Sequence, residues 1–490
     1  MISPDINNLK ELSKNYNLIP IFKEIRADFE TPISLFIKLG GNILLESVEQ
    51  GSNVGRYSII GVGKKYEFIF YGKQITINKY ESDQIEKTQK LERDNPLETI
   101  KEFLKNYKVA ELEGFPPFYG GLIGYLGYEI IQYFEKIPIK EGYDYPDGIL
   151  IIPEVIFVFD IIKRNVLGIM LIEVNDKLFE VYNQYSLRLN DLCDKIANSI
   201  LRKDVLFSGE KLKINYSTRK DEFIESIEKC KEYIIDGEII QVVISHYMEI
   251  ETKVDPFLLY RTLRILNPSP YMFYLDFDKF QIIGSSPEVM VRVQNKEMML
   301  KPIAGTRKRG LNLEEDEKIE KDLISDPKEK AEHIMLVDLG RNDLGKVALP
   351  GSVKVTEYMA IEKYSHVMHI VSTIKAILDD KFDVFDVIKA TFPAGTLTGA
   401  PKIRAMEIIN EMEKHKRGPY GGMILNLGYN MNLDSCITIR TIVLKDNIAR
   451  IQAGAGIVAD SDPENEYQET INKASALIKA IEIAQKGGKL

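Results

Sequence analysis

Short apolar runs separated by glycines constrain this chain more than any other feature of its sequence. Between residues 21 and 174 such runs recur at 42–46, 57–60, 66–70 and 74–77. Short runs of β-branched and aromatic residues bounded by turn residues are typical of β-strands. We therefore expect the first part of the chain to be rich in strands, with the charged segment 81–95 as a surface loop.

Strands and helices mix in the rest of the chain. Residues 221–235 have the spacing of a helix with an apolar face made of Phe223, Ile227, Cys230 and Ile234. Alternation predicts further strands at 239–250, 271–277, 281–283, 290–293 and 436–444. Helices are expected at 327–339, 401–412 and 463–484, each with a proline at or near its first turn. Because strands and helices do not alternate regularly, we expect an α+β fold with large antiparallel sheets and peripheral helices.

Charge balance and cysteine content narrow the class of protein. The 490 residues include 64 Lys and Arg against 73 Asp and Glu, a net charge of −9, which argues against a general nucleic-acid or anionic-membrane binder. Cys193, Cys230 and Cys436 are too few and too widely spaced for a disulfide framework and indicate a reducing compartment. The N-terminus lacks a signal-peptide pattern, and proline and charges interrupt the most apolar stretch, 148–162, so a cytoplasmic protein is expected.

Two of the expected helices begin in the same way, since residues 325–327 and 461–463 both read Ser-Asp-Pro, with Asp as the N-cap. The first helix then presents Glu332. The second presents Glu466 and Glu469 on one face, and a lysine follows four residues later. Carboxylates from two helices can hold a hard divalent ion such as Mg²⁺. From spacing alone, the commoner explanation is that these glutamates are solvated surface charges, some of them paired with the lysine.

The other polar features leave alternatives open. His366 and His369 would face opposite sides of a strand or one side of a helix, and a catalytic acid or base is as plausible as a structural histidine. Arg440 lies in an otherwise apolar strand and needs an anionic partner if it points inward. The basic segment 302–310 is expected to be a loop, for which solvation is the commoner explanation.

Six segments, in order along the chain, together resemble the chorismate-utilising enzymes. They are residues 237–243, 285–288, 302–307, 331–343, 392–402 and 452–458, the last followed by Glu466 and Glu469. The resemblance implies an α+β sandwich with the active site between the sheets. Within the family, the chain most resembles the anthranilate-forming branch. These lyases add ammonia to chorismate at C2, release the C4 hydroxyl and eliminate pyruvate, which is the first committed step of tryptophan biosynthesis.

The same resemblance implies the functional residues. The implied catalytic residues are Glu288, His369, Gln241 and Thr396. The implied substrate-binding residues are Ala304, Gly305, Thr306, Tyr420, Arg440, Gly454, Ala455, Gly456 and Lys473. The implied ligands of a Mg²⁺ cofactor are Glu332, Glu466 and Glu469, together with the ring carboxylate of chorismate. Given this resemblance, we no longer expect these glutamates to be only solvated surface charges.

Each implied role has a chemical reason. The Mg²⁺ ion would act as a Lewis acid and stabilise negative charge as the ring is attacked. Glu288 would be the general acid that protonates the departing hydroxyl, which needs a carboxyl with a raised pKa. His369 matches the histidine linked to the pyruvate elimination. Arg440 and Tyr420 would grip the enolpyruvyl carboxylate, with glycine amides assisting.

Two positions decide among the sister enzymes. The water-adding isochorismate and salicylate synthases carry a lysine base where this chain has Gln241, and a glutamine cannot deprotonate water. The aminodeoxychorismate synthases carry a nucleophilic lysine where this chain has Ala304, and a methyl group cannot attack the ring. Amination at C2 is therefore favoured. The remaining alternative, a non-catalytic amino-acid sensor on the same fold, would require the loss of an active-site group, and every expected carboxylate is present.

The N-terminal part matches the family less densely. A polar stretch at 201–220 predicts a boundary between an N-terminal regulatory and partner-binding region, 1–215, and a chorismate-binding catalytic domain, 216–490. The resemblance implies a feedback pocket for tryptophan formed by Glu46, Ser47, Arg56, Asn267, Pro268, Ser269, Pro270, Tyr271 and Met272. Judged from the residues alone, the Asn-Pro-Ser-Pro segment is simply a tight turn before a strand. Because the chain has no glutaminase Cys-His-Glu set, a separate glutamine amidotransferase subunit is the implied partner and source of ammonia.

Overall fold

The computed structural model describes residues 2–47, 55–140, 145–198, 212–364 and 367–488, and its strands form two twelve-stranded sheets. The first sheet contains, from edge to edge, β1 (Leu18–Arg26), β10 (Asn165–Glu173), β9 (Val155–Asp160), β3 (Tyr57–Val62), β2 (Ile43–Glu46), β13 (Tyr271–Asp276), β14 (Gln281–Ser286), β23 (Thr441–Lys445), β24 (Ile448–Ile457), β12 (Gln241–Glu251) and β11 (Ile214–Tyr216), with β20 (Gly399–Ala400) beside β12. Its neighbouring strands pair antiparallel.

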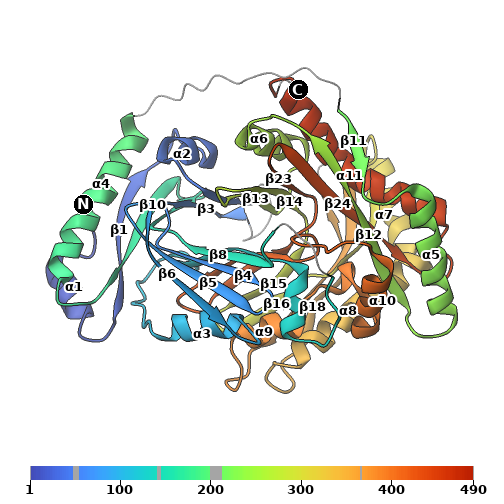
Figure 1. Cartoon of the computed structure of the whole chain (residues 1–490), viewed down its shortest axis with the longest axis horizontal. Helices are drawn as coiled ribbons and strands as arrows, with labels where there is room; N and C mark the ends of the chain where they lie inside the picture. The colour runs from blue at the N-terminus through green and yellow to red at the C-terminus, as the bar shows by residue number, and fades with distance from the viewer. Residues whose placement is uncertain (1, 48–54, 141–144, 199–211, 365–366, 489–490) are drawn as a thin grey trace.

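The second sheet is also antiparallel and lies face to face with the first (Figure 1). From edge to edge it contains β17 (Ile303–Lys308), β19 (Val367–Ile377), β16 (Glu297–Leu300), β15 (Val289–Gln294), β22 (Leu433–Ile437), β21 (Met423–Gly428), β7 (Gly121–Leu126), β8 (Gly148–Ile152), β4 (Tyr66–Tyr71), β5 (Gln74–Glu81) and β6 (Gln84–Glu92), with β18 (Lys354–Lys363) beside β19. The expected α+β sandwich is confirmed.

Helices cover the sheets and are held to them by apolar side chains. The helices packed on the first sheet are α1 (Ile6–Leu12), α2 (Pro32–Leu39), α4 (Leu178–Asn198), α6 (Pro256–Leu266) and α11 (Pro463–Gln485). Those packed near the second sheet are α3 (Leu97–Lys105), α7 (Leu313–Ser325), α8 (Pro327–Gly345) and α9 (Val384–Thr391). Two more, α5 (Lys220–Ile235) and α10 (Lys402–Met412), pack against β12 and β24. Short 3₁₀ turns are η2 (Tyr128–Tyr133) and η3 (Gly395–Leu397).

The largest hydrophobic cluster fills the space between the sheets. It joins Phe68 and Tyr125 of the second sheet to Phe273 and Ile282 of the first. Rings meet across the gap, as where Tyr125 lies 5.5 Å from Phe277. Burial of apolar surface on both faces of each sheet explains why the sequence shows so many continuous apolar runs.

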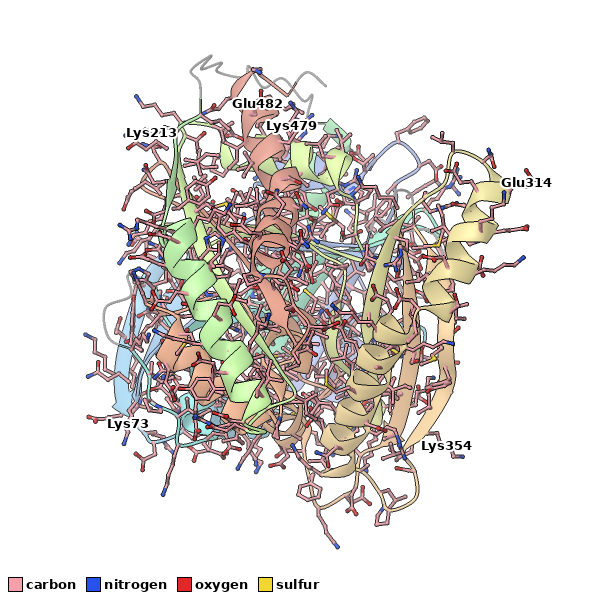
Figure 2. All side chains as sticks on the ribbon, turned by 90° about the vertical axis from the view of Figure 1, so that its right-hand side faces the viewer. Lys73, Lys213, Glu314, Lys354, Lys479 and Glu482 are labelled. Atoms are coloured by element: carbon pink, nitrogen blue, oxygen red, sulfur yellow. The ribbon has the colours of Figure 1, made fainter. Side chains whose placement is uncertain are left out.

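Charged side chains gather on the outside of the molecule. Figure 2 shows Lys73, Glu314 and Lys354 at its periphery, and it shows Lys479 and Glu482 near the C-terminal end of α11. The last two form an ion pair of 2.9 Å. No helix within the described ranges is long and apolar enough to span a membrane. The three cysteines are buried and free.

The expectation of a loop at 81–95 was wrong, because Gln84–Glu92 form the edge strand β6, paired with β5. Nearly all of its side chains are exposed, so the apolar alternation of a half-buried strand is missing. The hairpin is held by main-chain hydrogen bonds, and its charges discourage further pairing at the edge. A polar edge strand therefore has the composition of a loop.

The segment 302–310 is not a loop either, since it contains β17. Arg307 forms ion pairs of 2.9 Å with Asp326 and Glu329 and of 3.3 Å with Asp322. Arg309 pairs with Asp316. Most of these acids come from α7 and the start of α8, and α7 was not predicted from the sequence. The basic segment is therefore a strand whose charges are neutralised by the helices beside it.

Both sheets combine strands from either side of the expected boundary at 215/216. In the first sheet, β2 pairs with β13. In the second sheet, β7 pairs with β21. The boundary itself falls inside β11, and the segment 199–211 lies outside the described residues. The division into regions 1–215 and 216–490 stays a prediction about function along the chain.

Candidate active site

Two of the expected site residues lie where the chain passes from one sheet to the other. Glu288 follows β14 of the first sheet and precedes β15 of the second. Arg440 follows β22 of the second sheet and precedes β23 of the first. The single strand expected at 436–444 was therefore wrong. Arg440 has a φ of 51°, in the left-handed region, where a strand cannot continue.

Glu288 is buried with little to compensate a negative charge. It is 9% exposed, and the Thr396 hydroxyl donates a hydrogen bond of 3.0 Å to its Oε1. Burial raises the pKa of the carboxyl to about 8, although the Thr396 hydroxyl and the charge of Lys473 oppose the shift. Such a group holds its proton at neutral pH and can donate it to a leaving hydroxyl, as a general acid must.

Glu332 on α8 and Glu466 and Glu469 on α11 form one acidic group. Both helices begin as the sequence predicts, because the side chains of Asp326 and Asp462 accept hydrogen bonds from main-chain N–H groups of the first turn. Burial raises the pKa of Glu332 and Glu466, and the charge of Glu469 adds to each shift. The mutual repulsion indicates that negative charge from the two helices is concentrated in one place.

Lys473 and Gln241 border this acidic group. Lys473 Nζ lies 2.6 Å from Glu469 Oε1 and donates a hydrogen bond of 2.9 Å to the Gly454 carbonyl. Gln241 Nε2 lies 3.5 Å from Glu332 Oε1, while its Oε1 is buried without a hydrogen-bond partner. A buried amide oxygen without a partner is costly, so a donor on a bound molecule fits there.

The acidic group fits Mg²⁺ by its chemistry rather than as a complete cage. Within the described ranges no three His, Cys, Asp or Glu side chains are arranged to hold a metal ion by themselves. Mg²⁺ commonly uses one or two carboxylates and takes its other oxygens from substrate and water. Partly buried carboxylates that repel one another from two helices suit such an ion, because its charge would relieve that repulsion.

His369 lies on β19 beside a β-bulge in β17. The register shifts between Ala304 and Thr306, and Gly305 has a φ of 66°. The bulge lets the Gly305 carbonyl meet His369 Nδ1 at 3.0 Å, and Thr306 Oγ1 lies 3.1 Å from the same nitrogen. When Nδ1–H donates to that carbonyl, Nε2 remains a base, and burial lowers the pKa of the ring so that it stays neutral. Ala304 is buried in β17. His366, the other histidine considered from the sequence, lies outside the described residues.

Arg440 and Tyr420 provide a recognition site for an anion. The Arg440 guanidinium donates a hydrogen bond of 2.8 Å to the Lys473 carbonyl and forms no ion pair among the described residues. Burial lowers its pKa, which means that its charge lacks compensation. Its planar fork therefore has donors to offer a carboxylate.

Glycines in β24 make room for two of these side chains. A Cβ on Gly454 would lie 2.9 Å from Tyr420 Oη, and a Cβ on Gly456 would lie 2.7 Å from Gln241 Nε2. Ala455 points to the opposite face and packs in the cluster formed by α5, α10 and the two strands. Only the main chain of Ala455 is thus available to a substrate, and the glycines let Tyr420 and Gln241 approach the strand.

A second candidate site lies between the sheets, away from the acidic group. It is a pocket that includes Glu46, Ser47, Pro270, Tyr271 and Met272 among its lining residues. The Ser47 hydroxyl is buried and has no hydrogen-bond partner among the residues that the structure describes. Of the expected tryptophan ligands, these five line the pocket. The other four, Arg56, Asn267, Pro268 and Ser269, do not.

Several polar side chains in or near this pocket already have hydrogen-bond or ion-pair partners. Arg264 Nε donates to Glu46 at 2.5 Å, and the Tyr260 hydroxyl donates at 3.0 Å. Arg56 instead pairs with Asp160 at 2.8 Å. The Tyr271 hydroxyl donates to Asp434 at 3.0 Å. Glu46 is therefore a buried carboxylate whose charge is balanced, while the serine beside it is free to bind.

Sequence reasoning missed several residues around these sites. Glu329 precedes Glu332 by one turn, and its charge contributes to the raised pKa of Glu332. The pair repeats the three-residue spacing of the glutamates on α11, a signal that was there to find. The Thr438 hydroxyl is buried without a partner near Arg440 in sequence, and Arg417 is a buried arginine. No sequence pattern around Thr438 or Arg417 predicts that these side chains are buried.

Comparison with known proteins gives a consistent result. The profile of the family described as chorismate binding enzyme matches residues 41–479. A protein of Acetivibrio thermocellus named anthranilate synthase component 1 is 46% identical over 99% of both chains. One of the same name from Aquifex aeolicus is 44% identical over 98% of both.

A solved structure agrees. The crystal structure of anthranilate synthase component I from Streptococcus pneumoniae superposes with a TM-score of 0.76 and 36% identity, covering 92% of this chain and 98% of that one. Similarity therefore extends over nearly the whole length in sequence and in structure.

Proposed function

Because the chain belongs to the chorismate-binding enzyme family, we propose that it converts chorismate and ammonia into anthranilate and pyruvate, as the lyase that begins tryptophan biosynthesis. The full-length similarity to anthranilate synthase components supports the reaction. The observation that carries the chemistry is the buried, uncompensated Glu288, which keeps a proton available for the hydroxyl that must leave.

Substrate binding follows from the charges that border the site. Arg440 and Tyr420 bind the enolpyruvyl carboxylate of chorismate, and Lys473 and the main chain at Gly454 to Gly456 complete that side. Glu332, Glu466 and Glu469 would hold Mg²⁺. The ion, when bound, supplies positive charge against the ring carboxylate and so favours attack at the ring.

Two chemical steps then use different residues. In the first, ammonia attacks C2 while Glu288, held by Thr396, protonates the C4 hydroxyl as it leaves. Gln241 lies where a water-activating base would be needed and supplies only an amide, which suits ammonia because ammonia is itself a nucleophile. In the second step, His369 Nε2 accepts the proton whose removal accompanies loss of pyruvate.

The same residues argue against the sister reactions. Isochorismate formation needs a base at Gln241, and covalent amination at C4 needs a nucleophile at Ala304. Ala304 is a buried alanine in β17 and offers no such group. A glutamine amidotransferase subunit is the proposed source of ammonia, and the name component 1 borne by the relatives accords with a second component.

The pocket at Glu46 is the proposed site of feedback by tryptophan. The balanced carboxylate can receive an ammonium group, the free Ser47 hydroxyl adds a hydrogen bond, and Met272 offers an adaptable apolar wall. Strand β13 links this pocket to the catalytic acid. Met272 pairs with Glu46 on one side and with Ser285 on the other, and Tyr271 pairs with Ser286, two residues before Glu288. A displacement of β13 by a ligand would therefore be passed to the segment after β14 that carries Glu288.

Product identification tests the proposal most simply. Purified protein is incubated with chorismate, ammonium and Mg²⁺, and the product is followed by anthranilate fluorescence and by mass. We expect anthranilate and pyruvate in equal amounts, and no product from Glu288→Gln. Isochorismate or aminodeoxychorismate as the main product would contradict the proposal, as would turnover that is unaffected by Mg²⁺ removal.

A further inference from the structure

Arg417 is the most completely buried charged side chain in the core, with 2% of its surface exposed. It lies beyond the C-terminal end of α10, between the helix and β12. Burying a guanidinium is costly unless each donor finds an acceptor. Here the acceptors come from separate parts of the chain, Leu397 in η3, Val243 in β12 and Glu413 after α10, so the arginine ties these three segments together.

One set of its hydrogen bonds reaches the main chain on either side of the catalytic site. Nη1 donates to the Leu397 carbonyl at 2.7 Å, and Nη2 donates to the Val243 carbonyl at 2.7 Å. Leu397 follows Thr396 in η3, and Val243 lies two residues after Gln241 in β12. The short strand β20 pairs only Gly399 and Ala400 with β12. A further main-chain hydrogen bond, of 2.8 Å from the Val243 N–H to the Thr398 carbonyl, joins the two segments, and the guanidinium adds to this short link.

The other contacts fix the guanidinium itself. Nε and Nη2 donate to the Glu413 carboxylate at 2.9 and 2.6 Å. Glu413 also accepts from the main-chain N–H and the hydroxyl of Ser245, each at 2.8 Å. The guanidinium lies 4.6 Å from the ring of Tyr128 and 5.6 Å from the ring of Tyr420. It is held in one plane and packs near the tyrosine proposed to bind chorismate.

The main chain of Arg417 is anchored as well. Glu129 accepts hydrogen bonds from the N–H groups of Arg417 and Gly418, at 2.7 and 2.9 Å. Two buried glutamates therefore serve this one arginine, Glu413 at its side chain and Glu129 at its backbone. Such a network rigidifies a site only when every member is satisfied, which is the case for the guanidinium here.

From these contacts we infer that Arg417 is a positioning residue, which holds the turn carrying Thr396, the strand carrying Gln241 and the ring of Tyr420 in register around the reacting ring. The inference rests on the proposed function, but it concerns a residue that does not itself touch substrate. It predicts that the Thr396 hydroxyl stays on Glu288 only while Arg417 holds the Leu397 carbonyl. A lysine cannot replace it, because an ammonium lacks the planar fork that reaches three acceptors at once.

The test compares Arg417→Lys with the parent protein and with Thr396→Val, and each is measured for kcat, for KM of chorismate and for the pH dependence of kcat with ammonium as the nitrogen source. We expect Arg417→Lys to lower kcat about 100-fold, the effect of a small misplacement of reacting groups. We also expect the fall of kcat at alkaline pH, called the alkaline limb below, to move to higher pH by about one unit in Arg417→Lys. The reason is that the carboxylate form of Glu288 loses a hydrogen bond, which raises the pKa of Glu288. Thr396→Val should move the limb equally, and the double variant should move it no further.

Arg450→Lys is the matched control. Arg450 of β24 also bonds to β12, by hydrogen bonds of 3.0 and 2.6 Å to Glu249, and it lies 4.3 Å from the ring of Tyr247. It is thus a half-buried, carboxylate-paired arginine away from the site. Its substitution should leave kcat and the alkaline limb unchanged. If Arg417→Lys fails to fold, Glu413→Gln tests the same network. We expect a smaller fall in kcat and a shift of the alkaline limb in the same direction, to higher pH.

A second readout does not depend on turnover. The difference in unfolding free energy between a protein and its Glu288→Gln form, followed against pH, reports the pKa of Glu288. The folded pKa lies above the unfolded one, so the stability that Glu288 contributes is full at low pH and is lost as the pH rises through the folded pKa. Arg417→Lys should move that loss to higher pH.

The outcomes separate the two claims. A parent protein that makes no anthranilate would contradict the proposed function, and the stability readout would still decide the role of Arg417. An active parent with an Arg417→Lys form of unchanged kcat and unchanged limb would overturn the inference. So would a fall in kcat that tracks lost stability while the pKa of Glu288 stays in place in both readouts, because a purely structural role predicts that pattern.

Discussion

Glu46, in β2 of the first sheet, and Glu288, just after β14 of the same sheet, are two buried glutamates that differ in their partners. Glu46 is 5% exposed and is held by Arg264 and Tyr260. Glu288 is 9% exposed and receives one side-chain hydrogen bond, from Thr396. Burial raises the pKa of both, but at Glu46 the charge and hydrogen bond of Arg264 counter it. At Glu288 no arginine does, and the value reaches about 8.

The comparison shows that burial alone does not assign a role to a carboxyl group. A balanced carboxylate keeps its charge and suits binding of a cation such as the ammonium of an amino acid. An unbalanced one keeps its proton and suits acid catalysis. Strand β13 lies between the strands that carry or precede the two glutamates, so a difference in partners would separate the proposed regulatory site from the proposed catalytic acid within three neighbouring strands.

The sharpest test of the comparison replaces each glutamate by glutamine. Glu288→Gln should lower kcat by about 10³-fold or more, because it removes the proton donor and keeps the shape. Glu46→Gln should retain kcat within a few-fold but lower the free energy of unfolding by about 2 kcal/mol, because Arg264 loses a charged partner. Steady-state kinetics and denaturant unfolding check both, and equal loss of kcat in the two variants would break the comparison.

A second test concerns the metal. Glu332→Gln and Glu469→Gln should each lower turnover by about 10³-fold at limiting Mg²⁺, since the metal is expected to supply several kcal/mol of charge stabilisation. Circular dichroism should show an unchanged fold, and excess Mg²⁺ should restore part of the rate. Glu482 lies on the same helix as Glu469 and pairs with surface lysines, so Glu482→Gln serves as the control. Full activity of both variants at limiting Mg²⁺ would refute the ligand assignment.

A third test separates the two chemical steps. His369→Met should lower anthranilate formation by about 100-fold, the contribution of a general base. Consumption of chorismate should continue, so that the aminated intermediate, which still bears the pyruvyl group, accumulates. Mass spectrometry of quenched reactions detects it. If chorismate consumption and anthranilate formation fall together, His369 acts in the first step instead.

The smallest expected effect concerns regulation. Ser47→Ala and Met272→Thr should weaken inhibition by tryptophan about 10-fold, within the usual range of coupling between two sites, and leave uninhibited turnover near normal. Inhibition curves at fixed chorismate measure this. Unchanged inhibition in both variants would contradict the assignment of this pocket as the tryptophan site. The catalytic assignment would not be affected.

Sequence patterns predicted the elements whose periodicity comes from the core. The apolar runs at β3 and β4 and the cap-and-proline starts of α8 and α11 were found because burial and capping leave local signals. The edge strand β6 was missed because its side chains face solvent. Arg440 was placed inside a strand because a single left-handed residue leaves no trace in an apolar run.

The site was predicted in the same uneven way. Motif order identified Glu288 and the glutamates of the two helices. The partners that set their chemistry come from distant segments. Arg264 is 218 residues from Glu46, and Arg417 is 174 residues from Val243. No local spacing predicts such pairs, because they are created when strands from both halves of the chain meet in one sheet.

The central claim is that Glu288 holds its proton at neutral pH because burial outweighs the Thr396 hydrogen bond and the charge of Lys473, the two effects that favour its carboxylate form. The most direct measurement is the pH dependence of kcat for the ammonia-driven reaction, with chorismate, Mg²⁺ and free ammonia kept saturating at each pH. We expect a kcat that is constant around pH 7 and that falls by up to about 10-fold per pH unit as the pH rises through about 8. The claim also predicts that the residual activity of Glu288→Gln shows no such fall. A kcat that stays constant from pH 7 to well above 9, or that falls identically in Glu288→Gln, would contradict it.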